Sequence, residues 1–221
     1  MPHLLNVTKR FNTTKDRTLE CFEKVTFAGN RMMILLNNLL DLSKLEAGKK
    51  EYNYQENDFL EIVNEEVSKI IPQLETKGIS VVIDKPNVIT TCICDSDVIA
   101  QVIQNLLSNS IKFSEDSKKI KISFDSKHLP PGKILTDNSI IPALLVSVRD
   151  EGFGIPADEL ESIFDKFIQS SKTNTGAGGT GLGLSICREI IEGHHGKIWA
   201  ENNPEGGATF NVMLPYEQEV D

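Results

Sequence analysis

The sequence lacks any long apolar run, and no stretch of its 221 residues approaches the roughly 18 apolar residues that a membrane-spanning helix requires. Its first ten residues, MPHLLNVTKR, also lack the apolar stretch and the small-residue cleavage site of a signal peptide. We therefore expect no membrane segment in this chain and a cytoplasmic location.

Positive charge is scarce, because 23 Lys and Arg residues stand against 32 Asp and Glu residues, for a formal net charge of −9. A protein that binds the backbone of nucleic acid needs a basic surface to neutralise phosphates. The composition thus argues against nucleic acid as the main partner, although it is compatible with a local basic pocket for one nucleotide.

Cysteine is also sparse, with four residues: Cys21, Cys92, Cys94 and Cys187. No second Cys or His pair stands near Cys92 and Cys94 at the spacing of a zinc site. Two residues apart on a strand, these side chains point to the same face. We interpret the cysteines as reduced core residues of a protein in a reducing compartment.

The chain has ordinary globular composition, with 39% hydrophobic and 25% charged residues, and it contains no internal repeat. From about Asp16 to Ala47 the apolar residues recur in steps of three and four, which predicts one long helix. Its apolar seam is typical of a coiled coil or helical hairpin and needs a partner helix; it contains Phe22, Val25, Met32, Leu36 and Leu39. Gly48 stands where a left-handed cap is expected, so we place a domain boundary between residues 1–48 and 49–221.

After this boundary the pattern changes to mixed α/β. Helices are expected after Asp58, after Asp95 or Asp97, and after Gly183. Strands are expected at 52–55, 79–83, 90–94, 120–124, 143–148, 197–201 and 208–214. The run 143–148 is continuously apolar and predicts a central strand, whereas 126–142 predicts a long insertion between two strands.

The helix around residues 101–113 carries Asn105, Asn109 and Lys112 on one stripe, with apolar residues on the other side. One interpretation is a solvated face. The other is that the amide oxygens hold a hard cation such as Mg²⁺, while the lysine meets phosphate.

The strand ending in Asp150 delivers a carboxylate to a tight turn that contains Gly152 and Gly154. An ionised aspartate only accepts hydrogen bonds, which suits an exocyclic amine such as that of adenine. Glycines let the backbone approach a flat ring closely. Taken alone, this pattern is shared by many tight turns.

A glycine-rich stretch from Gly176 to Gly183 leads into the third helix. Glycines before a helix N-terminus expose N–H groups beside its partial positive charge, which indicates a phosphate cradle. The stretch lacks the lysine of a Walker sequence, and the preceding 170–175 is a polar loop rather than the strand of a Rossmann fingerprint. A mobile loop is the alternative, and a lid must also move.

Together, in this order and spacing, these segments resemble the catalytic, ATP-binding domain of sensor histidine kinases, in the GHKL superfamily of gyrase, chaperone and mismatch-repair ATPases. The segments similar to the N, G1, F and G2 boxes are Asn105–Phe113, Asp150–Gly154, Ile163–Phe167 and Gly179–Leu184. His195–Trp199 and Gly206–Phe210 match the closing hairpin, and Asn38–Gly48 resembles the second helix of the dimerisation domain.

The resemblance implies an α+β fold: a two-layer α/β sandwich with a mixed sheet covered by helices, the Bergerat-type ATP-binding fold, preceded by a long helix of a helical-hairpin dimerisation domain. Residues 1–48 would be part of the dimerisation and histidine-phosphotransfer region, and 49–221 the catalytic domain. The activity implied is that of an ATP-dependent protein-histidine kinase of a two-component system, with ATP and Mg²⁺ as cofactors. The implied partners are a response-regulator receiver domain and a second copy, bound through the N-terminal helical region in the parent protein, of which this chain would be a cytosolic part.

By the same resemblance, Asp150 binds the adenine amine, Asn109 with help from Asn105 holds Mg²⁺, and Lys112 meets phosphates. The lid is expected at about 169–179, with Phe164 and Phe167 anchoring its start, and Thr209 on the pocket floor beside the adenine. The residues expected to bind ATP are Asn105, Asn109, Lys112, Phe113, Asp150, Gly152, Gly154, Ile155, Lys166, Phe167, Gly179, Thr180, Gly181, Leu182, Gly183, Leu184 and Thr209.

Related hydrolases carry a glutamate, the general base for water, where this helix has Asn105. A carboxamide cannot take that proton, so the site should bind ATP, hydrolyse it poorly and await a neutral imidazole.

The phosphoacceptor pattern of the family, His-Glu/Asp-x-Arg-Thr-Pro, is absent from the sequence, whose histidines are His3, His128, His194 and His195. We interpret His194 and His195 as structural. Either the chain is a truncated piece of a longer protein, or it acts on a histidine in another molecule, or its first helix is shortened. The alternative functions are a nucleotide-binding scaffold without productive transfer and an anti-sigma-type serine kinase, and the dimerisation-like helix argues against the latter.

Overall fold

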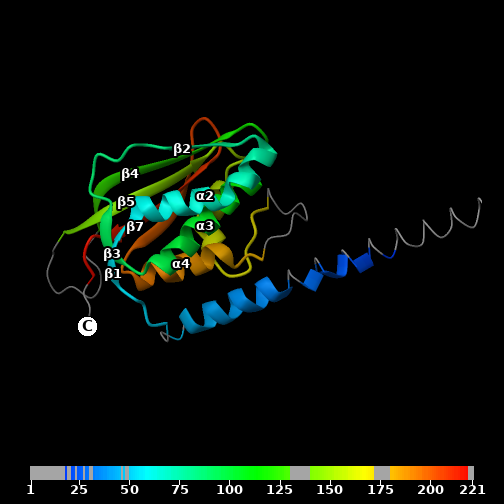
Figure 1. Cartoon of the computed structure of the whole chain (residues 1–221), viewed down its shortest axis with the longest axis horizontal. Coiled ribbons are helices and arrows are strands. Elements are labelled where there is room, and N and C mark those ends of the chain that lie inside the picture. The colour runs from blue at the N-terminus through cyan, green and yellow to red at the C-terminus, as the bar shows by residue number, and fades with distance from the viewer. Residues whose placement is uncertain are drawn as a thin grey trace, which may run out of the picture. The chain divides into compact units, whose positions relative to one another are not determined.

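The computed structural model describes residues 18, 21–22, 24–26, 28–29, 32–45, 47, 50–129, 140–171 and 180–218. The chain divides into two compact units, Met1–Leu40 and Asp41–Asp221 (Figure 1). The candidate site lies in the second unit, so the fold is described mainly there.

The N-terminal segment is helical wherever it is described between residues 18 and 45, and residues 32–45 form an uninterrupted helix. The apolar seam expected from the sequence is exposed, with between 43% and 66% of each side chain open to solvent at Phe22, Val25, Met32, Leu36 and Leu39. Such a stripe is stable in water only when a partner covers it. Among the described residues, no helix combines the length and the apolar character needed to cross a membrane.

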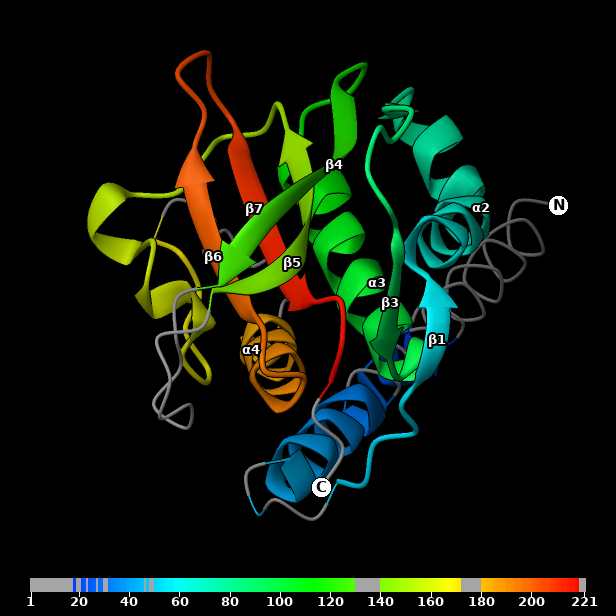
Figure 2. The same ribbon diagram turned by 90° about the vertical axis from the view of Figure 1, so that its left-hand side faces the viewer.

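Five strands of the second unit form one mixed sheet in the order β2-β4-β5-β7-β6 (Figures 1 and 2). β2 runs parallel to β4, and the other neighbouring pairs are antiparallel. β5 lies in the middle, which confirms the central strand predicted from its apolar run. The bounds are β2 Ser80–Ile83, β4 Lys119–Leu129, β5 Ile141–Asp150, β6 Lys197–Asn202 and β7 Ala208–Pro215.

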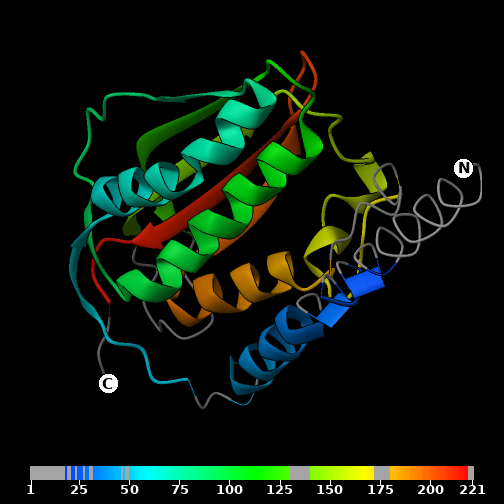
Figure 3. The same cartoon turned by 45° about the vertical axis from the view of Figure 1, so that its right-hand side comes forward.

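Three helices cover one face of this sheet, so the unit has the two-layer architecture expected (Figures 1 and 3). They are α2 (Phe59–Lys77), α3 (Ser96–Phe113) and α4 (Gly183–Gly193), and α3 packs between the other two. The predicted caps are confirmed, because Asp58 accepts a hydrogen bond from the N–H of Leu60 and Asp95 from those of Asp97 and Val98. Two short 3-10 turns, η1 (Ala157–Glu159) and η2 (Ser162–Phe164), follow β5.

A separate two-stranded sheet joins β1 (Gln55–Asp58) to β3 (Thr91–Cys94). The sequence pattern predicted the first of these strands at 52–55, which is three residues too early. The reason is that Asn53 donates its N–H to the Asp95 carboxylate (3.0 Å), while Tyr54 donates its hydroxyl to the Gly193 carbonyl (2.7 Å). Residues 53 and 54 therefore bind the ends of α3 and α4, and the strand begins only at Gln55. On β3, Cys92 and Cys94 are both buried on one face, as expected.

The hairpin of β4 and β5 is longer than the sequence predicted, because its ladder continues to the pair Leu129 and Ile141. Residues 126–129 and 141–142, expected in an insertion, are therefore strand. Leu129 packs with Ala143 and Met213 in a small apolar cluster, and this packing explains the extension. The remainder of the expected insertion, 130–139, lies outside the described residues.

His194 is a fully buried histidine that ties the segment before β1 to two helices. Its ring lies between those of Tyr52 and Tyr54, with centroids 4.6 and 5.2 Å away. Its Nε2 accepts the N–H of Asp95 (3.1 Å), so the proton sits on Nδ1, which donates to the Ile190 carbonyl (2.8 Å). The ring is therefore structural and neutral, and burial lowers its pKa.

Protonation of His194 would place an Nε2–H against the N–H of Asp95. Because the pKa is lower in the folded protein than in the unfolded chain, the unfolded state binds more protons as pH falls below about 6.5, and stability falls with it. We expect His194→Phe to lose about 1–3 kcal/mol at pH 8 through its two missing hydrogen bonds. The gap in unfolding temperature from the wild type should shrink between pH 8 and pH 5.

The matched control is His128→Asn at an exposed histidine of β4, which should keep the wild-type pH profile of the unfolding temperature. A gap between His194→Phe and the wild type that stays constant over this pH range would contradict the assignment.

Candidate functional site

Asp150 ends β5 with a carboxylate that is only 4% exposed. Its Oδ1 accepts two backbone N–H groups, those of Gly152 (2.9 Å) and Ala208 (3.0 Å). Burial raises the pKa of this carboxyl group, and the two N–H donors partly oppose the rise. The Ser110 hydroxyl beside the carboxyl also lowers the pKa, and within the described part of the chain both backbone donors meet Oδ1 and none meets Oδ2. The carboxylate is thus oriented through one oxygen and can accept from a ligand through the other.

The turn after Asp150 packs against the end of α3. A Cβ on Gly152 would lie 2.5 Å from the carbonyl oxygen of Phe113, and Phe153 donates its N–H to the same oxygen (3.3 Å). Gly154 has a φ of +67°, which favours glycine. The predicted residues Phe113, Gly152 and Asp150 are therefore brought together, although 37 residues separate the first from the last.

The polar stripe of α3 leads from Phe113 toward the start of α4. Asn105, Asn109 and Lys112 are all half-buried, and the ammonium of Lys112 lies 4.8 Å from the ring centroid of Phe113. At the other end of the stripe, the side-chain oxygen of Asn105 is 3.0 Å from where a Cβ on Gly183 would lie. The stripe thus connects the carboxylate end of the site to the glycine turn.

The glycine turn at 180–183 leaves the first turn of α4 without a side-chain cap among the described residues. Leu182 is fully buried and anchors the turn, and Gly181 takes a φ of +70°. The N–H groups at such a helix start lack intrahelical partners and carry partial positive charge. This arrangement can bind an anion such as phosphate. Thr180 and Leu182 lie in this turn and Leu184 in the first turn of α4, and their binding of ATP stays a prediction.

The segment before the expected lid is held through its backbone and one ring. Phe164 is buried against Phe210, at 6.4 Å between centroids, and Arg188 stacks on it at 4.9 Å. Phe164 is thus an anchor, as predicted. The ring of Phe167 is not one, since it is 60% exposed, while its N–H donates to the Gly181 carbonyl (2.9 Å). Its backbone, at a φ of +63°, provides the connection to the glycine turn. Lys166, beside it, is also exposed.

Thr209, expected on the pocket floor beside the adenine, has its side chain on the sheet face opposite that of Asp150, which argues against that place. It pairs with Arg149 across β5 and β7, so both side chains point to the sheet face opposite that of Asp150. Its hydroxyl donates to the side-chain oxygen of Asn203 (2.6 Å). Ala208 is the residue of β7 that contacts the carboxylate. Because side chains alternate along a strand, the apolar Phe210 would have indicated that residue 208, and not 209, faces Asp150.

Two of the expected features, Gly179 and the part of the expected lid at 172–179, lie outside the described residues, and so does His3. Gln169, Ser170 and Ser171 are described, and Ser171 donates its N–H to the Glu159 carboxylate (3.1 Å).

The donor set suits a nucleotide with a cation. Among the described residues no group of three His, Cys, Asp or Glu side chains could hold a metal by itself. Asn105 and Asn109 offer neutral amide oxygens, which are ligands for Mg²⁺ when substrate phosphates supply the others. The Ser110 hydroxyl is buried beside the Asp150 carboxyl, whose pKa it lowers against the effect of burial, and it makes no other hydrogen bond in the described chain.

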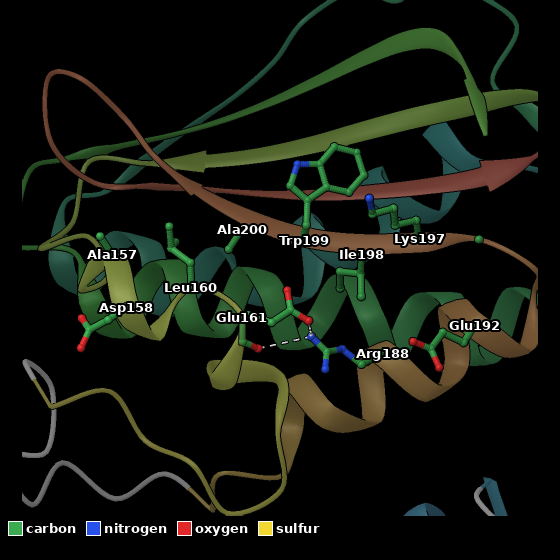
Figure 4. Close-up of a pocket in the computed structure, with 11 residues that line it drawn as sticks. Ala157, Asp158, Leu160, Glu161, Arg188, Glu192, Lys197, Ile198, Trp199 and Ala200 are labelled. Carbon is green, nitrogen blue, oxygen red and sulfur yellow. Dashed lines mark hydrogen bonds and ion pairs between the residues drawn. The ribbon is translucent and has the colours of Figure 1, made fainter. Parts of the chain in front are cut away.

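A second hollow, of about 510 Å³, lies along β6 outside this site (Figure 4). It contains none of the residues expected to bind ATP, and Arg188 and Glu161, which line it, form an ion pair (2.7 Å). Its walls come from the segment after β5, from α4 and from β6, with Ala157, Asp158, Leu160, Glu161, Arg188, Glu192, Gly196, Lys197, Ile198, Trp199 and Ala200.

Sequence reasoning missed Asn202 and Asn203, which follow one another at the end of β6. The Asn202 amide binds both the N–H and the carbonyl of Ile155, and Asn203 donates to the carbonyl of Asp150 (2.9 Å). Two adjacent carboxamides at the end of a strand were the available signal.

Comparison with known proteins gives one family. Residues 94–218, more than half of the chain, match the family described as histidine kinase-, DNA gyrase B-, and HSP90-like ATPase. The sensor histidine kinase WalK of Bacillus subtilis (strain 168) is 34% identical over 193 residues, which are 86% of this chain and 29% of that protein. The sensor protein kinase WalK of Staphylococcus aureus (strain MRSA252) is 31% identical, over 85% of this chain and 29% of that protein. The chain thus spans less than a third of the length of these relatives.

Solved structures agree with this result. The catalytic domain of histidine kinase ThkA, in a nucleotide-free form, superposes with a TM-score of 0.59 at 31% identity, over 76% of this chain and 99% of that one. ThkA in complex with the response regulator protein TrrA gives a TM-score of 0.64 at 27% identity, over 86% of this chain and 49% of that one. The geometry of the site and these similarities lead to one assignment: the chain belongs to the family of histidine kinase-, DNA gyrase B- and HSP90-like ATPases.

Proposed function

We propose that this chain is the ATP-binding catalytic part of a sensor histidine kinase of a two-component system, which transfers the terminal phosphate of ATP to a histidine. The observation that carries the proposal is the buried carboxylate of Asp150, with one oxygen oriented by backbone donors and the other open to a ligand. Residues 49–221 form the catalytic domain in this proposal, and residues 1–48 belong to the dimerisation region.

At the base end of the site, Asp150 accepts a hydrogen bond from the exocyclic amine of adenine. Phe113 and the Gly152–Ile155 turn lie next to the carboxylate and form the walls for the base and sugar. A base that presents a carbonyl oxygen at that position would face the carboxylate with no proton between them, so the site selects adenine over guanine.

At the phosphate end, the glycine turn and the start of α4 donate N–H groups to the phosphate oxygens. Asn109, with Asn105 beside Gly183, holds Mg²⁺ together with those oxygens, and Lys112 adds positive charge. The cation neutralises charge on the phosphates. Asn105 cannot take a proton from water, so the terminal phosphate persists until an imidazole nucleophile arrives.

The receiving histidine is proposed to lie in a helix that carries the acceptor pattern absent from this sequence. His194 does not serve, because it is buried and both of its ring nitrogens are bonded. The exposed apolar seam at Phe22 to Leu39 is proposed to pack against such a helix in a homodimer of the parent protein. A response-regulator receiver domain is the proposed final acceptor, supported by the complex known for ThkA.

Replacing Asp150 with Asn should separate nucleotide binding from folding. The amide can turn a donor toward the adenine amine, and a lost charged hydrogen bond of about 1.5–3 kcal/mol lowers ATP affinity about 10- to 150-fold. The nucleotide-free unfolding temperature should not fall at pH 7. Because burial raises the pKa of Asp150 in the folded protein, its ionised carboxylate destabilises the fold at neutral pH. This cost is relieved only as the pH falls through the folded pKa toward the pKa of the unfolded chain.

Calorimetric titration and thermal unfolding measure these two quantities. Asp125→Asn, an exposed carboxylate on β4, is the matched control and should bind ATP as the wild type does. Equal ATP affinity of the Asp150→Asn variant and the wild type would overturn the adenine assignment.

Asn109→Ala should weaken binding of Mg-ATP far more than binding of metal-free ATP, because a hard cation needs the amide oxygen. We expect a loss of roughly 10-fold or more with Mg²⁺, the size of one charge-assisted contact, and little change in chelator. Gln104→Ala removes an exposed carboxamide from the same helix and should change neither affinity. Equal losses with and without Mg²⁺ would exclude Asn109 as a ligand.

Phosphotransfer is tested with ATP labelled in its terminal phosphate. The chain alone should form no acid-labile, base-stable label, whereas a separately supplied dimerisation fragment that carries the acceptor pattern should become labelled. The same fragment with the Asp150→Asn chain should not. Label on the wild-type chain that disappears in a His3→Gln variant would show that the acceptor lies in this sequence.

A further inference from the structure

We propose that Asn202 is a positioning residue for adenine recognition, which holds the far end of the loop that carries Asp150. The inference rests on the ATP-binding function proposed above. Asn202 is the last residue of β6, and its amide makes two hydrogen bonds to one residue of the loop. The N–H of Ile155 donates to its Oδ1 (2.8 Å), and its Nδ2 donates to the Ile155 carbonyl (2.6 Å).

These two hydrogen bonds have the same arrangement as the backbone hydrogen bonds between two paired strands. A side-chain amide presents one acceptor and one donor side by side, as the backbone of a neighbouring strand does. The contact is close, because a Cβ on Gly154 would lie 2.9 Å from Oδ1 of Asn202. The loop therefore continues the sheet at β6 through a side chain.

The near end of the same loop is held by the next residue. Asn203 donates from Nδ2 to the Asp150 carbonyl (2.9 Å), and its Oδ1 accepts the hydroxyl of Thr209 (2.6 Å). Residues 150–155 are thus held at both ends by two adjacent carboxamides, 47 and 53 residues away along the chain.

The clamp formed by the Asn202 and Asn203 side chains determines where Oδ2 of Asp150, the oxygen proposed to bind adenine, points. Oδ1 of Asp150 accepts from Gly152, inside the loop, and from Ala208. Ala208 is the ladder partner of Asn202. The hairpin of β6 and β7 therefore supplies one donor to the carboxylate, from Ala208, and through Asn202 it also holds the loop that supplies the other donor. Movement of the loop relative to β6 would turn Oδ2 away from the amine without affecting the phosphate end.

The test compares ATP with purine riboside triphosphate, which has hydrogen in place of the 6-amino group. Asn202→Asp keeps the size of the side chain and the acceptor for the Ile155 N–H, but it replaces the donor with an oxygen that faces the Ile155 carbonyl. We expect ATP affinity to fall about three- to tenfold, as for loss of a hydrogen bond, with less than about a twofold change for the analogue.

Two further variants separate positioning from general loosening. Asn57→Asp breaks comparable bonds, from Nδ2 to the carbonyls of Gln55 (3.1 Å) and Cys94 (2.9 Å), away from the site, and should leave the affinity ratio unchanged. Asn202→Ala removes both groups without adding charge and should lower the ratio as Asn202→Asp does.

The outcomes are distinct. A lowered ratio of ATP to analogue affinity in both Asn202 variants supports the inference. A ratio that stays at the wild-type value overturns it, whether both affinities fall equally or neither falls. A wild-type protein that binds neither nucleotide, or both equally well, overturns the adenine assignment itself and the inference with it.

Discussion

The carboxylate of Asp150 is removed from water at the end of β5, and its charge is tolerated there because two backbone N–H groups meet one of its oxygens. This arrangement requires β7 to pair with β5 in one register, so that Ala208 arrives opposite the carboxylate. It also requires a glycine at 207, since a Cβ there would collide with the Asp150 carbonyl. The rest of the site is built around this buried charge.

The two ends of the site come from different layers of the fold. The sheet supplies the base end through the ends of β5, β6 and β7, and the helices supply the phosphate end through α3 and the start of α4. α3 links them, and both of its ends are held from outside. Lys77 of α2 donates to the carbonyls of Ile111 (2.7 Å) and Ser114 (3.1 Å) at one end, and Asp95 at the other binds Asn53 and His194.

The segment before β1 connects the N-terminal helix to the helices of the site. Tyr52 and Tyr54 enclose His194 at the end of α4, and Asn53 binds the residue that caps α3. This segment therefore holds the N-terminal end of α3 and the C-terminal end of α4. These contacts are local, and protonation of the neutral His194 in acid would weaken them.

Much of the fold and of the site was determined by the sequence, because the interactions involved are local. The caps at Asp58 and Asp95, the apolar run of β5 and the glycines before α4 operate within a few residues. What only the tertiary structure decided depends on contacts between distant segments: the shifted start of β1, the exposed ring of Phe167, the placement of Thr209 away from Asp150, and the clamp from Asn202. Hydrogen bonds across some 50 residues leave no period in a sequence, since each needs a particular register and loop path that only the folded chain creates.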